Sequence, residues 1–394
     1  MGMSIAILYE HPETDELGIK ATAQEMGVEL IHIPFRLVSI TVSNDAFRIR
    51  SKAKEYTWVL ERVGAVLNRA QSKNRRLYAS SIMEALGKPV INSSRVEYIC
   101  FSKLRTLLEF RRAGVKIPKS VFVPCNSHEF LENMAKIHNE VSIADLLEME
   151  LDGAMVIKPD SGTHGRDVRL VKSREGLIQL LEDTQPSIIN PVGIFAQEFV
   201  DKWFYDLRIV VSKERGKPPY CHPFALARAG FKDFRTNTFL GNMVFGVKLP
   251  ASIVEAAERC GMAIGGDSAW ILALDAMPRV EGSRPADDEC IRSDLEKLEP
   301  YFDNIKKVKR NPAKMKDFQT WNKRLEEAFD LYKRTEPYER VKRAIEENLE
   351  KVKERVMFHE ANSCPEFWEQ TRLMTGANLA EHMIKCALSV ANSG

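Results

Sequence analysis

The chain has 394 residues, of which 44% are apolar and 28% charged, a composition typical of a globular protein with two or three domains. The formal net charge of +2 gives no case for nonspecific nucleic-acid binding, and no segment resembles a membrane span or a signal peptide. Seven scattered cysteines, with no Cys-x-x-Cys pair or Cys/His cluster, argue against a disulfide framework or a zinc site, so we expect reduced thiols in a cytoplasmic protein.

The first 95 residues have the pattern of a small α/β domain. Residues 4–9 read as a buried strand, a helical stretch near 16–26 follows, and an apolar strand at 29–33 comes next. This βαβ opening predicts a parallel sheet. A helix near 75–86 and a short strand at 89–92 complete the domain, which we bound at residues 1–95.

The pattern changes after residue 95. A helix at 98–113 and a strand with a glycine loop at 153–165 belong to a predicted central domain, residues 96–190. The rest of the chain, residues 191–394, forms a predicted C-terminal domain that contains an apolar strand at 269–275.

A highly charged stretch at 279–355 interrupts the C-terminal domain. Apolar residues recur there with helical spacing on two faces: Trp321, Leu325, Ala328, Phe329 and Tyr332, and then Val341, Ile345, Leu349 and Val352. Thr335-Glu336-Pro337 between them has the pattern of an N-cap with proline in the first turn. We therefore predict a helical hairpin inserted between two strands. A solvated decoration, an oligomer contact and recognition of a protein or peptide substrate all remain open as its role.

The strand predicted at 356–362 ends in an acid and an amide, Glu360 and Asn362. Residues i and i+2 of a strand share a face, so both side chains point the same way. Hard oxygen donors are the ligands of Mg²⁺ in sites that carry nucleotide phosphates. The alternative is solvated polar surface on an edge strand.

A second candidate lies at 155–165, where an apolar strand ends in Lys158 and a loop with Gly162 and Gly165 follows. A lysine at a strand end can reach a phosphate oxygen, and glycines let backbone N–H groups approach it closely. The loop is not a Walker A motif, and an ordinary hairpin turn is the alternative. His164 in this loop is either a base or merely a polar loop residue.

The order of these pieces is more specific than any one of them. The lysine and glycine loop are followed by Gln197-Glu198-Phe199-Val200, Asp206-x-Arg208, Arg235-x-Asn237, an apolar strand ending at Asp275, and finally Glu360-x-Asn362. This succession resembles the ATP-grasp superfamily, and in particular its RimK/LysX-like branch of amino-acid ligases, over roughly residues 60–278 and 356–385. The resemblance implies an α/β ATP-grasp fold with an N-terminal Rossmann-like pre-ATP-grasp domain, here with a helical hairpin insertion.

The resemblance also implies roles by position. ATP contacts fall on Lys103, Lys158, Gly162, Thr163, Gly165, Gln197, Glu198, Phe199, Val200 and Asn237. Catalytic roles at the transferred phosphate fall on Arg208 and Arg235, and Mg²⁺ ligands are Asp275, Glu360 and Asn362, for two ions with Mn²⁺ as an alternative. The chain departs from the family at Phe239-Leu240-Gly241-Asn242, where His-Arg-Gly-Gly is common, and in its long insertion.

The implied reaction joins a carboxylate to an amine through an acyl phosphate, with release of ADP and phosphate. A basic cluster at Arg69, Lys73, Arg75 and Arg76 fits a glutamyl-bearing small molecule, peptide or carrier protein, or else is a solvated helix start. A small-molecule kinase and an ATP-binding regulatory or scaffold protein are the rival functions. We expect a homo-oligomer, with no nucleic-acid or membrane partner.

Overall fold

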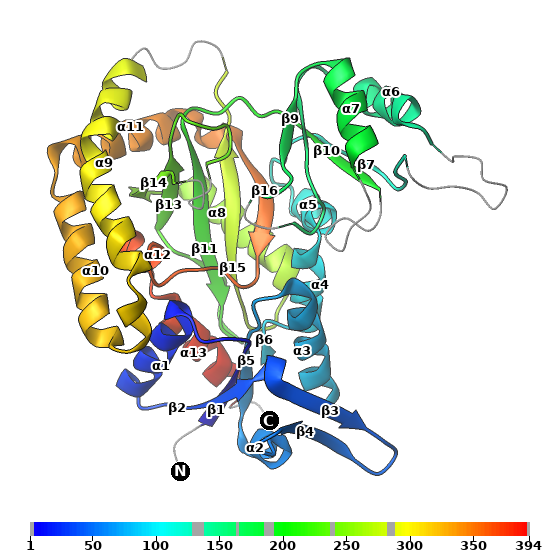
Figure 1. Ribbon diagram of the computed structural model, residues 1–394, viewed down its shortest axis with the longest axis vertical. Coiled ribbons are helices and arrows are strands. Elements are labelled where there is room, and N and C mark those ends of the chain that lie inside the picture. Colours follow the sequence, from blue (N-terminus) through cyan, green and yellow to red (C-terminus); the bar gives the residue numbers. More distant parts are fainter. Residues whose placement is uncertain are drawn as a thin grey trace.

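The structure is a computed structural model that describes residues 4–127, 138–162, 165–184, 193–236, 241–281 and 288–391. These residues form three large β-sheets, a two-stranded sheet and the helices that flank them (Figure 1). Within the described ranges, no helix combines the length and the hydropathy needed to cross a membrane.

The N-terminal sheet is parallel, with strand order β2-β1-β5-β6. Its strands are β1 (Ser4–Tyr9), β2 (Glu29–Pro34), β5 (Ala65–Arg69) and β6 (Val90–Ile91). The helices of this region are α1 (Thr14–Glu25), α2 (Thr57–Arg62) and α3 (Lys73–Ala85), and a hairpin of β3 (Val38–Val42) and β4 (Phe47–Ser51) projects from it. The four central residues of β1 are fully buried, as expected for a strand covered on both faces.

The second sheet is antiparallel, with strand order β7-β10-β8-β9. Its strands are β7 (Ser120–Val123), β8 (Met155–Ile157), β9 (Arg169–Val171) and β10 (Ile194–Glu198), and α6 (Glu140–Glu150) and α7 (Arg174–Asp183) lie beside it. Because β10 lies between β7 and β8, this sheet continues past the predicted boundary at residue 190. The three domain ranges remain a proposal about folding units.

The third sheet is antiparallel, with strand order β14-β13-β11-β15-β16, and β12 pairs with β11. Its strands are β11 (Tyr205–Lys213), β12 (Tyr220–Cys221), β13 (Phe224–Ala229), β14 (Met243–Lys248), β15 (Trp270–Pro278) and β16 (Val356–Asn362). Helices α5 (Lys103–Arg112) and α8 (Ala251–Gly265) pack against each other and against this sheet. Its other face carries the polar residues described below.

Two segments join the N-terminal sheet to the third sheet. Helix α4 (Ser94–Phe101) leads directly into α5, and α12 (Thr371–Thr375) and α13 (Leu379–Ala391) close the chain, with α13 packed against α1, β5 and β15. The approach at α1 is close, because a Cβ atom on Gly18 would lie 2.1 Å from the ring of Trp368. The N-terminal sheet and the third sheet are therefore connected through α4 and α5 and through α13.

The insertion between β15 and β16 contains three helices. The predicted helical hairpin, with two helices, was therefore one helix short. Helix α9 (Asp288–Arg310) precedes the two predicted helices, α10 (Phe318–Lys333) and α11 (Glu336–Val352) (Figure 1). Helix α9 contains Pro300, a residue that argues against a helix interior when only the sequence is considered. Its apolar residues nevertheless recur with helical spacing and are buried.

The apolar face predicted for the insertion packs within the chain. Trp321, Leu325, Phe329 and Tyr332 are all buried. The Tyr332 hydroxyl donates to the Val244 carbonyl at 3.2 Å, and the Tyr338 hydroxyl accepts from the Gly246 N–H at 3.2 Å, so the insertion binds the edge strand β14. The insertion thus covers a sheet edge that would otherwise present unpaired backbone groups.

Candidate functional site

A cleft of about 940 Å³ lies among the three sheets and the insertion. The third sheet contributes Asp275 and Glu360, the second sheet contributes Lys158, and α5 contributes Lys103. In the described part of the chain, fourteen lysine and arginine residues and eight carboxylate residues line it. A cleft with this excess of cations attracts anionic ligands.

Strand register brings the predicted catalytic and metal residues together. Arg208 of β11 pairs with Asp275 of β15, and Asp275 pairs with Glu360 of β16. Directly paired residues of neighbouring strands lie on the same face of a sheet, so the three side chains form a row across the cleft face.

A β-bulge sets the position of Glu360. The register shifts between Asp275 and Ala276, so that Ala276 pairs with Phe358 and His359 becomes the extra residue. A bulge of this kind redirects side chains, and here it leaves Phe358 in the core while His359 and Glu360 line the cleft. Burial, together with the Lys158 charge, lowers the pKa of His359 to about 4, so its ring is neutral at pH 7.

Two arginines hold the carboxylate of Asp275. Arg208 donates to it through Nε at 2.9 Å and through a terminal nitrogen at 3.0 Å, and Arg228 lies 3.3 Å away. Arg228 also donates to Asp206 at 2.7 Å. Burial acts to raise the pKa of Asp275, but the charges of Arg208 and Arg228 outweigh it and hold the pKa well below the usual carboxylate value.

Lys103 connects α5 to the glycine loop and to β16. Its Nζ donates to the Gly162 carbonyl at 2.9 Å and lies 3.8 Å from the carboxylate of Glu360. The helix end is also tied to Asp160, whose side chain accepts from the N–H of Leu104 at 3.0 Å. Burial acts to raise the pKa of Glu360, and the charges of Lys103 and Lys73 lower it below its usual value.

Lys158 is a buried cation at the end of β8. Its Nζ donates to the Gln197 side chain at 2.8 Å, and Gln197 donates in turn to the Ser120 hydroxyl at 2.9 Å. Burial, reinforced by the charge of Lys103, lowers the pKa of Lys158 to about 7. A phosphate bound beside this lysine would restore its proton.

This lowered pKa predicts a pH-dependent affinity for ADP. Below pH 7 the lysine is already protonated, whereas above pH 7 binding must take up a proton, so affinity falls by up to about tenfold per pH unit as the pH rises. Calorimetric titration with ADP between pH 7.5 and 9, in buffers of different ionisation enthalpy, measures both the affinity and the proton uptake. The Lys158→Arg variant stays charged and should show a flatter profile; equal profiles would contradict this role of Lys158.

Arg235 links the glycine loop to the third sheet. It donates to the Gly165 carbonyl at 3.1 Å and pairs with Asp233 through two nitrogens, at 3.0 and 2.8 Å. Gly165 has a φ of 68°, a conformation that favours glycine. The predicted site residues Thr163 and Asn237, and His164, lie outside the described residues.

The strand predicted to face adenine lines the cleft with Glu198, Phe199 and Val200. The Glu198 carboxylate accepts from the N–H of Lys119 at 2.8 Å and pairs with Arg279 at 2.5 Å. Phe199 packs edge-on against Phe234, with the ring centroids 6.3 Å apart. Phe199 and Val200 thus give the cleft an apolar wall, while the backbone N–H groups of Glu198 and Phe199 donate to the carbonyls of Lys119 and Ala154.

The predicted metal ligands fit a hard cation by their chemistry. Glu360 and Asp275 supply carboxylate oxygens on one face, and Asn362 lines the same cleft with a buried amide nitrogen that has no partner in the described residues. In those same ranges no three His, Cys, Asp or Glu side chains group closely enough to hold a metal alone. The donors therefore fit Mg²⁺ that shares its coordination with phosphate and water.

In the basic cluster at residues 69–76, Arg69, Lys73 and Arg76 all line the cleft, and the two arginines are buried in ion pairs. Arg69 pairs with Asp15 at 3.0 Å, and Arg76 pairs with Glu97 at 2.7 Å, which also accepts from Ser363 at 2.6 Å. These two arginines hold the N-terminal sheet to the segment after β16.

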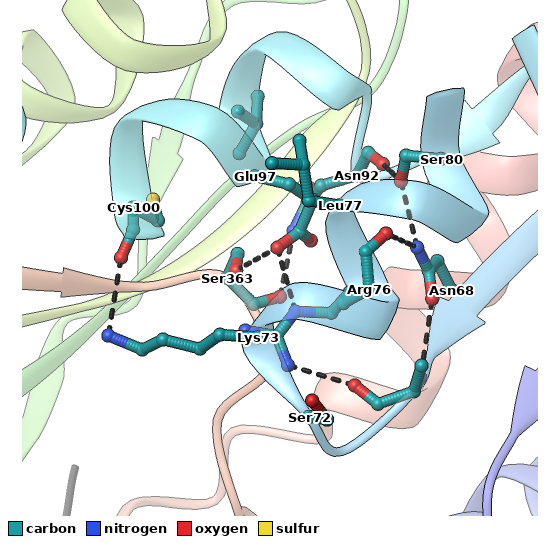
Figure 2. Close-up of polar contacts among 12 residues, drawn as sticks. Asn68, Ser72, Lys73, Arg76, Leu77, Ser80, Asn92, Glu97, Cys100 and Ser363 are labelled. Carbon is teal, nitrogen blue, oxygen red and sulfur yellow. Dashed lines mark hydrogen bonds and ion pairs between the residues drawn. The ribbon is translucent and has the colours of Figure 1, made fainter. Parts of the chain in front are cut away.

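Lys73 extends away from this network towards Cys100, whose carbonyl accepts from its Nζ at 3.5 Å (Figure 2). It makes no ion pair in the described part of the chain. Burial, reinforced by the charge of Lys103, lowers the pKa of Lys73 to about 8. The solvated-helix alternative thus does not describe Lys73, which lines the cleft.

Several residues that line the site were not predicted as site residues. Asp206 lies two positions before Arg208, so strand alternation could have identified it. His359 lies inside the Glu360 motif, but only the bulge brings it into the cleft. For Arg228 the sequence holds no such signal, because its role depends on the pairing of β13 with β11.

No protein-family model matches the chain. The α-aminoadipate–LysW ligase LysX of Saccharolobus solfataricus is 29% identical over 53% of this chain and 68% of its own length. The enzyme of the same name from Sulfurisphaera tokodaii is 25% identical over 69% of this chain and 84% of its own length.

Two solved structures resemble nearly the whole chain. D-alanyl-alanine synthetase A of Vibrio cholerae superposes with a TM-score of 0.58 at 10% identity, over 99% of both chains. The ATP-grasp ligase PsnB, with minimal precursor, Mg and ADP, superposes with a TM-score of 0.54 at 10% identity, over 98% of both chains. At such identities the likeness shows the fold alone, and it confirms the predicted fold class.

Proposed function

We propose that this chain, an ATP-grasp protein of the RimK/LysX-like branch, is an ATP- and Mg²⁺-dependent ligase that joins a carboxylate to an amine. The observation that carries the proposal is the row Arg208–Asp275–Glu360 with Lys103 and Lys158 in the same cleft. These groups supply the cations and carboxylates that a phosphoryl transfer from ATP needs.

The reaction has two steps because a carboxylate is a poor electrophile. An oxygen of the carboxylate takes the γ-phosphoryl group of ATP, which yields an acyl phosphate and ADP. The amine then attacks the carbonyl carbon, phosphate leaves, and the nitrogen loses a proton. We assign Lys103 and Lys158 to the phosphate oxygens, with Gln197 holding Lys158 in place. Arg208 and Arg235 are assigned to the transferred group, and Asp275 fixes the orientation of Arg208.

The remaining ATP contacts are assigned to the glycine loop with Thr163, to residues 197–200 and to Asn237. Asp275, Glu360 and Asn362 would hold Mg²⁺, and we propose two ions with Mn²⁺ as an alternative. A metal bound there would neutralise charge on the phosphates of ATP.

We further propose that the acid is glutamate-like and that the substrate is a carrier protein or peptide. Two relatives are named as ligases of α-aminoadipate and LysW, which supports an acidic substrate on a protein carrier. Lys73 supports an anionic substrate, since it is a cleft cation without a carboxylate partner in the described ranges. The seven cysteines are thiols rather than disulfides, which supports a cytoplasmic location. A homo-oligomer remains a prediction for sedimentation to test.

The test is a turnover assay with Mg²⁺, ATP and a panel of acids that includes glutamate and α-aminoadipate. A ligase releases ADP in the presence of acid and amine, and it forms a hydroxamate when hydroxylamine traps the acyl phosphate. A stable phosphorylated product without release of phosphate would identify a kinase instead. Background turnover with every acid and carrier would favour a regulatory protein.

A further inference from the structure

The insertion carries a strongly basic segment at residues 306–316, which we name the basic segment. It holds six lysines and arginines and no acidic residue, in a chain whose net charge is only +2. Basic residues near the C-terminus of α9 interact favourably with the helix dipole, which accounts for part of the pattern. Lys314 and Lys316 lie beyond the end of α9, so the dipole does not account for them.

The basic segment extends from the cleft to the outer surface. Lys306, Lys309, Arg310 and Lys314 line the cleft, whereas Lys307 and Lys316 are exposed outside its lining. The turn between α9 and α10 lies near the start of α1, because Glu369 accepts from Thr14 and pairs with Lys314, and it lies away from the second sheet (Figure 1).

Carboxylates neutralise the basic segment only in part. Glu369 pairs with both Lys309, at 3.2 Å, and Lys314, at 3.3 Å, and Asp303 pairs with Lys306 at 3.1 Å. Lys307, Arg310 and Lys316 make no ion pair in the ranges that the structure describes. Six cations therefore face two carboxylates, and the segment can accept several further negative charges.

We propose that the basic segment is a docking surface for an acidic polypeptide that carries the substrate group into the cleft. The inference rests on the proposed ligase function, because a polypeptide supplies both the carboxylates that match these cations and a group that can be ligated. A free small acid would meet only the cations inside the cleft and would leave Lys307 and Lys316 unused. Electrostatic attraction along the whole segment also speeds encounter with an acidic partner.

The test uses a fluorescent oligo-glutamate peptide and the full chain, with binding followed by anisotropy at several salt concentrations. One variant replaces Lys307, Arg310 and Lys316 by glutamine. A matched control replaces Lys323, Arg343 and Lys351, which are exposed residues of α10 and α11 outside the cleft lining. We expect salt-sensitive binding that the first variant weakens about tenfold and the control changes less than twofold.

Three results would overturn the proposal. The first is that both variants weaken peptide binding equally, and the second is that free glutamate at the same carboxylate concentration displaces the peptide fully. The third is that an oligoribonucleotide of the same charge binds more tightly than the peptide. The last would indicate a nucleic-acid surface. ADP binding to the wild-type chain is measured in parallel. If the wild-type chain binds the peptide but not ADP, the result would contradict the ligase function and still support the basic segment as a docking surface for acidic polypeptides.

Discussion

Replacement of Glu360 by glutamine is expected to reduce ATP-dependent ADP formation by about a thousandfold, which corresponds to ~4 kcal/mol of transition-state stabilisation. The substitution keeps the shape of the side chain but removes the negative charge that lies opposite Asp275 and 3.8 Å from Lys103. Without that charge, the Mg²⁺ that we propose at this site would be held more weakly. Steady-state ADP release at saturating ATP and Mg²⁺ measures the effect.

The matched control for this prediction is Glu366→Gln, the same chemical change at an exposed residue of the same cleft. We expect it to change turnover by less than about threefold, because surface charges interact weakly in water. The urea midpoint of Glu360→Gln should stay close to that of the wild-type chain. Similar losses of turnover in the two variants would show that Glu360 has no special role.

Replacement of Asp275 by asparagine is expected to lower the free energy of unfolding by about 3 kcal/mol. Asp275 is buried between Arg208 and Arg228, so the substitution removes the ion-pair partner of Arg208 and leaves Arg228 with Asp206 alone. Urea unfolding followed by circular dichroism measures the change. Glu360→Gln is thus expected to lower turnover without a loss of stability. Asp275→Asn is expected to lower both turnover and the free energy of unfolding.

The pH dependence of this effect has a definite sign. The pKa of Asp275 is held below its usual value in the folded chain, so its contribution to stability is present above about pH 4, the unfolded value, and is lost as the pH falls towards the folded pKa. The difference between wild type and Asp275→Asn should shrink in that acid range. The control Asp303→Asn removes an exposed pair with Lys306 and should cost less than about 1 kcal/mol at any pH.

Local patterns predicted much of the site. The two-residue spacing of Glu360 and Asn362 placed both at the end of one strand, and Lys158 was expected where β8 ends. These predictions need only the alternation of a single strand and the glycines that follow it. The helical spacing in α10 and α11 likewise predicted their buried faces, because each face is defined within one helix.

Two features of the insertion could not be predicted from such local patterns. Helix α9 was not predicted, because Pro300 weakens the local helical preference, and packing against α10 and α11 overcomes that cost. The sequence also left open whether the insertion is a solvated decoration, an oligomer contact or a surface that recognises a substrate. The contacts of Tyr332 and Tyr338 with β14 show that its apolar face packs within the chain itself.

The sequence by itself determined the order of the phosphate, arginine and carboxylate motifs and the face on which each side chain leaves its own strand. The tertiary structure decided which of them meet. Asp275 lies between Arg208, Arg228 and Glu360 only because β15 pairs with β11 and β16, and a bulge at His359 adjusts the register. The physical reason is that alternation is a property of neighbouring residues, whereas register depends on hydrogen bonds between strands far apart in the chain. Lys73 and the basic segment show the same division, since their charges are evident in the sequence and their shared cleft is set by packing.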